Sequence, residues 1–162
     1  MAENPQSIHL SNTAPNFRFA TAADVALVNE LDSFSNSPTR DIHRDLEKYF
    51  GSVDPSTHEL TLILLAEVEQ RAVGKAELML APQEREATDA IGYIKRVIVR
   101  PDFRAHGLAR QMLQYLIAYA RNDLRLQSLD LHVWEENYPA LRLYQSLGFE
   151  VKHRELYLKL AL

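Results

Sequence analysis

The 162-residue sequence contains no cysteine. Disulfides, thiolate metal sites and a cysteine nucleophile are therefore all excluded. A strong basic charge is missing too, because the formal net charge is −4 and both signs are mixed along the chain. Nucleic-acid binders usually carry a basic patch or stripe. We therefore expect no nucleic-acid partner.

Long apolar runs are also absent, and no stretch is long enough to span a membrane. Residues 1–15 are polar and lack the basic and apolar regions of a signal peptide, which predicts a flexible tail. A hydrophobic content of 46% is enough for one well-packed domain of this length. We expect a tail over 1–15 and a single cytoplasmic domain over 16–162, without a membrane partner.

Hydrophobic periodicity predicts the elements of this domain. Alternating or continuous apolar runs indicate strands at 17–20, 59–68, 71–81, 90–100, 126–134 and 154–162. Three- and four-residue spacings with capping residues indicate helices at 22–31, 38–50, 108–121 and 138–147. The order β, α, α, three antiparallel strands, α, β, α, β predicts an α+β or mixed α/β fold around one twisted sheet.

One of only five glycines, Gly107, stands between a predicted strand and a predicted helix in the stretch RAHGLA. The start of a helix presents unpaired amides and the positive end of the helix dipole, and Arg104 and Arg110 add charge nearby. This combination favours a phosphate group. A plain turn in which glycine serves only the bend explains the residues equally well.

Two segments resemble the GCN5-related N-acetyltransferase (GNAT) family. VIVRPDFRAHGLARQML at 97–113 is similar to the family's first motif, whose loop holds the pyrophosphate of acetyl-CoA. LHVWEENYPALRLYQSLGFE at 131–150 is similar to the second half of its signature. The resemblance implies a GNAT-type acyl-CoA N-acyltransferase fold, a central twisted, mostly antiparallel mixed sheet flanked by helices. It also implies acetyl-CoA as co-substrate.

The resemblance assigns roles to particular residues. Tyr144 is the general acid that protonates the departing thiolate, and Asn137 contacts the cofactor. Backbone groups of the 97–99 strand pair with the pantetheine arm, and one N–H polarises the thioester carbonyl. The cofactor-binding residues implied are Val97, Ile98, Val99, Arg104, Ala105, His106, Gly107, Leu108, Ala109, Arg110, Asn137 and Tyr144.

The general base is open at this point. An amine of pKa ~10.4 must lose a proton before it attacks. Some relatives place a glutamate on the central strand, whereas 91–99 contains no acid. Glu77 on the preceding strand, Glu135 after the next strand, or a base acting through water could fill this role. Without cysteine, no acyl-cysteine relay can form, so the amine attacks directly in a ternary complex.

The six histidines show no close pair at ligand spacing, so we expect no metal. The predicted activity is transfer of an acetyl group to a primary amine on a small molecule or peptide. Helices 22–50 and the loops at 81–90 and 134–138 would select the acceptor. The alternatives are a non-catalytic acyl-CoA-binding sensor of the same fold and a general phosphate-binding module. The sequence is compatible with a homodimer, which is a common assembly.

Overall fold

The computed structural model describes residues 14–35, 53, 58–81, 90–156 and 158–162. The chain divides into two compact units, one ending at Leu131 and one beginning at His132. The helix predicted at 38–50 and most of the predicted acceptor loop at 81–90 lie outside the described residues.

The first unit is built on one five-stranded sheet with strands in sequence order. The strands are β1 (Asn16–Phe19), β2 (Leu60–Val68), β3 (Arg71–Leu80), β4 (Ile91–Val99) and β5 (Ser128–Leu131). The first four strands pair antiparallel, and β5 pairs parallel to β4. The predicted mixed, mostly antiparallel sheet is thus confirmed. The connection from β4 to β5 contains a helix, as parallel neighbours require.

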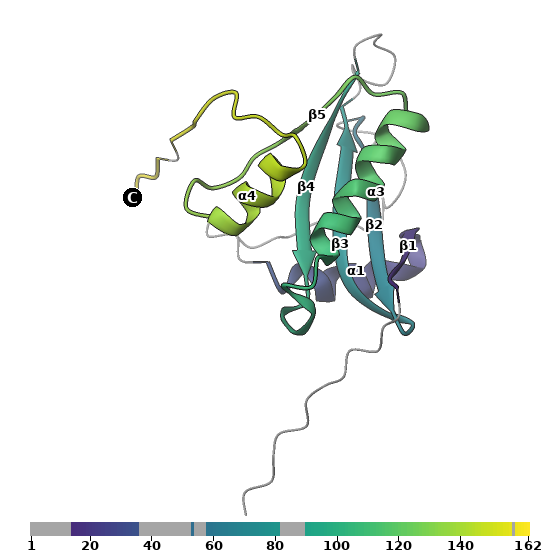
Figure 1. Cartoon of the computed structure of the whole chain (residues 1–162). Coiled ribbons are helices and arrows are strands. Elements are labelled where there is room, and N and C mark those ends of the chain that lie inside the picture. The colour runs from purple at the N-terminus through teal and green to yellow at the C-terminus, as the bar shows by residue number, and fades with distance from the viewer. Residues whose placement is uncertain (1–13, 36–52, 54–57, 82–89, 157) are drawn as a thin grey trace, which may run out of the picture. The chain divides into compact units, whose positions relative to one another are not determined.

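Two helices cover the two faces of this sheet (Figure 1). Helix α1 (Val25–Asp32) packs on one face through Val28 and Leu31, which meet apolar side chains of β2. Helix α3 (Leu108–Asn122) lies on the other face, where a Cβ at Gly74 would be 3.1 Å from a carbon of Met112. None of the described helices is both long and apolar enough to cross a membrane.

A short 3-10 turn, η1 (Ala22–Asp24), leads into α1 at the predicted position. The Thr21 amide donates to a carboxylate oxygen of Asp24 at 2.7 Å, and the Thr21 hydroxyl lies 3.2 Å from the same oxygen. Arg18 on β1 binds the Asp24 carboxylate through two 2.8 Å hydrogen bonds. Asp24, which contacts Thr21 at the start of the helix, therefore also ties this end of the helix to the sheet.

The second unit contains helix α4 (Tyr138–Ser146), as predicted from its capping residues. Asn137 accepts a 3.4 Å hydrogen bond from the Ala140 amide, and Gly148 ends the helix with φ +95°. The strand predicted at 154–162 was wrong, because the described residues of that segment are in no strand. Alternating leucines give strand propensity, but a strand also needs a partner to complete its ladder.

Candidate active site

The turn before α3 has the geometry that the phosphate motif requires. Gly107 has φ +80° and ψ 5°, a left-handed conformation that favours glycine. A Cβ added at Gly107 would meet no atom within 4 Å. The first helical hydrogen bond at this end joins the Gln111 amide to the Gly107 carbonyl at 3.1 Å. The start of the helix thus has amides outside its own ladder and open space beside them.

Ala105, two residues earlier, also has a positive φ, of +62°. An alanine in this region is strained by its Cβ, whereas glycine is not. The turn before α3 thus contains two residues with positive φ, Ala105 and Gly107.

Arg104 is directed at main-chain carbonyls. Its Nε donates to the Val99 carbonyl at 3.0 Å, and a terminal nitrogen donates to the Phe34 carbonyl at 3.2 Å. The guanidinium therefore fastens the loop to the end of β4 and to the chain just after α1. Its charge lies within a loop whose residues 104–107 are all exposed.

The C-terminal half of β4 differs from its first half in pairing. The parallel ladder with β5 runs from Ile91↔Ser128 to Ile94↔Leu131 and ends there. On its other edge, β4 continues its ladder with β3 as far as Val99. The edge formed by 95–99 consequently extends past the end of β5. An extended ligand can add to such an edge as a further strand.

A β-bulge interrupts this half of β4. Lys75 pairs with Ile98 and Glu77 pairs with Lys95, so two residues of β4 lie opposite the single Ala76. Arg96, one of those two, has φ +50°. A bulge of this kind changes the direction of the groups that follow it. Val97 is the second residue of the bulge, and Ile98 and Val99 come directly after it.

Glu77 is fully buried and is held by two cations. The Lys75 Nζ lies 2.5 Å from one carboxylate oxygen, and an Arg96 nitrogen lies 3.2 Å from the other. Both carboxylate oxygens thus already contact cations, and the side chain is closed off from solvent. Glu77 is therefore not open to a substrate amine. The sequence pattern of β3 gave no sign that these charges are enclosed.

In the second unit, Tyr144 is half-buried and packs edge-on against Phe149, with ring centroids 5.9 Å apart. Burial raises the pKa of the Tyr144 phenol, because the charged phenolate is disfavoured away from water. The hydroxyl therefore keeps its proton at neutral pH. Glu135 is exposed, and its carboxylate lies 3.5 Å from Arg154.

The chain resembles known proteins in both sequence and fold. The sequence model described as "Acetyltransferase (GNAT) family" matches residues 26–149, which is most of the chain. The chain belongs to the GNAT acetyltransferase family. The fold agrees, because a predicted acetyltransferase from Clostridium acetobutylicum, solved with acetyl-CoA, has a TM-score of 0.66 at 22% identity. That match covers 90% of this chain and 96% of the other.

Two curated relatives give a sense of the divergence within the family. A glucosamine 6-phosphate N-acetyltransferase from Trypanosoma brucei brucei is 29% identical over 56% of this chain and 58% of its own length. An L-2,4-diaminobutyric acid acetyltransferase from Vibrio cholerae is 33% identical over 59% of this chain and 52% of its own length. The chain thus spans about half the length of the curated relatives that it matches.

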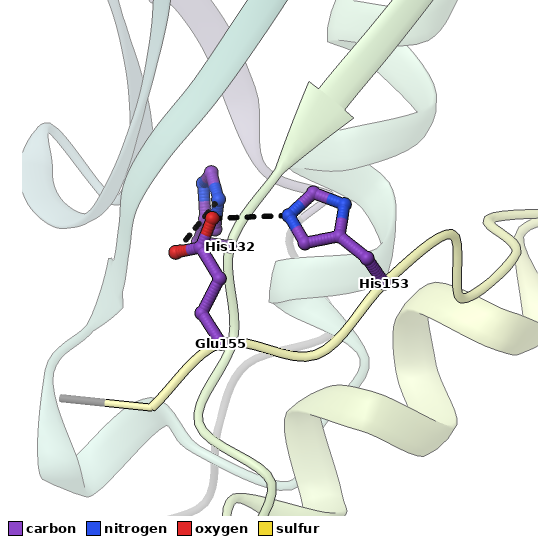
Figure 2. Close-up of side chains that lie close together, drawn as sticks. All are labelled: His132, His153 and Glu155. Carbon is purple, nitrogen blue, oxygen red and sulfur yellow. Dashed lines mark hydrogen bonds and ion pairs between the residues drawn. The ribbon is translucent and has the colours of Figure 1, made fainter.

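This GNAT domain also has a cluster that the sequence did not reveal, formed by His132, His153 and Glu155 (Figure 2). Glu155 lies 3.0 Å from the His153 Nε2 and 3.7 Å from the His132 Nε2. The three groups could surround a metal ion, but all are more than half exposed. The contacts with Glu155 already account for their approach, and exposed pairs of this kind contribute little to stability.

Proposed function

We propose that this chain transfers the acetyl group of acetyl-CoA to a primary amine, by direct attack in a ternary complex. The observation that carries the proposal is the left-handed Gly107 turn, with open space where a Cβ would stand. Its position at the start of a 15-residue helix makes it a suitable cradle for a pyrophosphate.

Residues 104–110 would hold the pyrophosphate. The amides of Gly107, Leu108 and Ala109 supply hydrogen-bond donors, and Arg110 and the helix dipole supply positive charge. Arg104 keeps the loop in place through its bonds to two carbonyls. Ala105 and His106 form the exposed turn between them. The donor set fits a diphosphate, because it is made of amides and cations and contains no acid.

The β4 edge at Val97, Ile98 and Val99 would take the pantetheine arm. Support comes from the ladder with β5, which ends at Ile94 and leaves this part of β4 outside it. A main-chain N–H in this segment would polarise the thioester carbonyl, so that negative charge developing on its oxygen is stabilised. Acetyl-CoA supplies the activated acyl group, and the protein orients it.

The proton transfers would fall to residues of the second unit. Tyr144 gives its proton to the departing thiolate, the role that the family resemblance assigns to it. Asn137 contacts the cofactor by family resemblance and also caps α4. Of the two candidate bases, Glu135 is favoured over Glu77, because its carboxylate is mostly exposed although it contacts Arg154, whereas that of Glu77 is fully buried. Glu135 would take the amine proton directly or through water.

The acceptor is a primary amine on a small molecule or peptide. The named relatives act on glucosamine 6-phosphate and on diaminobutyric acid, both of which carry an amine. A non-catalytic sensor of acyl-CoA would need the cradle but no acid. The presence of Tyr144 at the position of the family's general acid therefore favours the enzyme.

Calorimetric titration of acetyl-CoA and free CoA tests the cradle. Gly107→Asn places a side chain in the open space while tolerating a positive φ, and we expect affinity to fall at least about tenfold. Gly148→Asn is the matched control, since Gly148 also has a positive φ and open space around it. It should keep the wild-type affinity. Equal binding by wild type and Gly107→Asn would remove the cofactor assignment.

Amine-dependent thiol release then separates an enzyme from a sensor. Wild-type protein with acetyl-CoA is mixed with a panel of amino sugars, diamino acids, polyamines and peptides, and free thiol is measured. Release that depends on one amine class supports the transferase and names the acceptor class. Tight binding of acetyl-CoA with no release above the amine-free rate would support the sensor instead.

A further inference from the structure

Four charged side chains form a buried ion-pair chain in the first unit. Lys75 contacts both Asp32, at the end of α1, and Glu77, and Glu77 in turn contacts Arg96 on β4. The side chains of Lys75 and Glu77 are 0% exposed, that of Asp32 is 8% exposed and that of Arg96 is 25% exposed. Two cations and two carboxylates alternate, so the charges of the ion-pair chain cancel.

Stability alone is a poor explanation for such an arrangement. Removing charges from water is costly, and apolar side chains of similar size often stabilise a core at least as well. Lys75 and Glu77 lie opposite Leu65 and Ile63 of β2, both buried apolar residues. An apolar pair would therefore suit this face of β3. A buried network instead constrains the groups at its ends to particular positions.

The buried ion-pair chain ends at the bulge on β4. Arg96 stands in the bulge with φ +50°, a conformation that is strained for any residue with a Cβ. Such a conformation persists when its surroundings hold it. The contact with Glu77 anchors the Arg96 side chain to β3, the strand that pairs with the bulged part of β4.

The position of the bulge decides how the following residues present their backbone. Successive residues of a strand point alternately to opposite faces and edges, so one inserted residue reverses this alternation for those that follow. Val97 is the second residue of the bulge, and Ile98 and Val99 follow it and pair in the shifted register with Lys75 and Gly74. Loss of the bulge would redirect the amides of this segment.

We propose that the buried ion-pair chain of Asp32, Lys75, Glu77 and Arg96 positions the β4 amides that polarise the thioester. Glu77 and Arg96 are positioning residues, which act through the backbone of Val97–Val99 and not on the substrate. The inference rests on the proposed function, because it assumes that this segment takes the acetyl-CoA arm. It assigns to Glu77 a role different from that of a general base.

Arg96→Met is the principal test, because the side chain is partly exposed and Glu77 keeps Lys75 as its partner. We expect kcat to fall about 10- to 100-fold, since a small displacement of a catalytic group has effects of this size. The KM for acetyl-CoA should change less than about threefold, because the pyrophosphate cradle is untouched. Glu77→Gln should act in the same direction, and Arg96→Lys, which keeps the cation, should restore most of kcat.

Arg18→Met is the matched control. Arg18 also bridges two carboxylates, those of Asp24 and Glu67, each at 2.8 Å, but from β1. The Arg18→Met variant should have a lower melting temperature but a kcat within about twofold of wild type. Wild-type kcat in both Arg96→Met and Glu77→Gln would overturn the inference, whatever happens to their melting temperatures.

A second measurement does not depend on the acceptor. In 15N-labelled protein, the coupling between the amide proton and the Hα of residue 96 distinguishes a positive φ from an extended strand. We expect the wild-type value in Arg96→Lys and a shift towards the extended value in Arg96→Met. An unchanged coupling in Arg96→Met would show that the bulge forms without the buried ion-pair chain, and would overturn the inference. Failure of wild-type protein to bind acetyl-CoA would refute the proposed function instead.

Discussion

The two units of the chain use the same kinds of residue in different ways. Among the described residues, every fully buried side chain belongs to the unit that ends at Leu131. The described residues from His132 on include half-buried and exposed side chains but none that is fully buried. The first unit is therefore fixed by its own core. The second offers side chains such as Tyr144 and Glu135 at partly solvated positions.

The contrast is clearest in two pairs of polar side chains with the same spacing. Lys75 and Glu77 are two residues apart on β3, and His153 and Glu155 are two residues apart near the C-terminus. Both pairs are in contact, at 2.5 Å and 3.0 Å. The first pair is completely buried and the second is mostly exposed. Spacing sets which side chains can come into contact, and burial sets how strongly the loss of that contact affects stability.

The largest expected effect is on stability. Lys75→Met removes the central cation between two buried or nearly buried carboxylates, so we expect unfolding free energy to fall by about 3–5 kcal/mol. Glu155→Gln is the comparison from the exposed cluster and should leave the denaturation midpoint unchanged within error. Urea denaturation measures both. Similar midpoints for the two variants would break the contrast between the units.

The second effect concerns catalysis and leaves the fold intact. Tyr144→Phe removes the hydroxyl proposed to protonate the thiolate, and the ring contact with Phe149 can remain. We expect kcat to fall about 100-fold, with the KM for acetyl-CoA changed only a few-fold. Steady-state thiol release with the best acceptor checks this. A normal kcat would return Tyr144 to a packing role and leave the acid unassigned.

A glycine in each unit gives a smaller and purely structural comparison. A Cβ at Gly92 on β4 would lie 2.7–2.8 Å from methyl carbons of Leu126, Leu129 and Leu78. Gly92→Ala should therefore destabilise by about 1–3 kcal/mol through overpacking. Gly148→Ala meets open space and adds only the strain of its positive φ, about 1 kcal/mol. Thermal melts rank the two, and the reverse order would contradict the difference in packing.

The smallest expected effect is on the pH dependence of stability, at acidic pH. Hydrogen bonds from Arg18 hold the pKa of Asp24 well below its usual range. A carboxyl with a depressed folded pKa stabilises the protein above its unfolded pKa of about 3.9. That stability is lost as the pH falls through the folded value.

We therefore expect the melting temperature of wild-type protein to fall below about pH 4 more steeply than that of Asp24→Asn. Arg18→Met should flatten the profile in the same way, because it removes the partner that depresses the pKa. Parallel profiles for wild type and both variants would mean that this pair does not couple folding to pH.

Much of the fold followed from local pattern. The hydrophobic spacing in 108–121 predicted α3, and the alternation in 59–100 predicted the three central strands, because each signal lies within one element. The strand expected at 126–134 formed only at Ser128–Leu131, and the segment at 154–162 formed none in its described residues. In both places the outcome depended on pairing with distant residues, which propensity does not encode.

The sequence by itself determined the absence of cysteine chemistry, the order of the elements from β2 to α4 and the RAHGLA turn, because composition and short-range periodicity are properties of neighbouring residues. Only the tertiary structure decided that Lys75 and Glu77 are enclosed with Asp32, and that Arg96 stands in a bulge with a positive φ. It also brought His132 to within reach of Glu155. These features arise from contacts between residues far apart in the chain. Burial, register and strain exist only after the sheet and its helices have packed together.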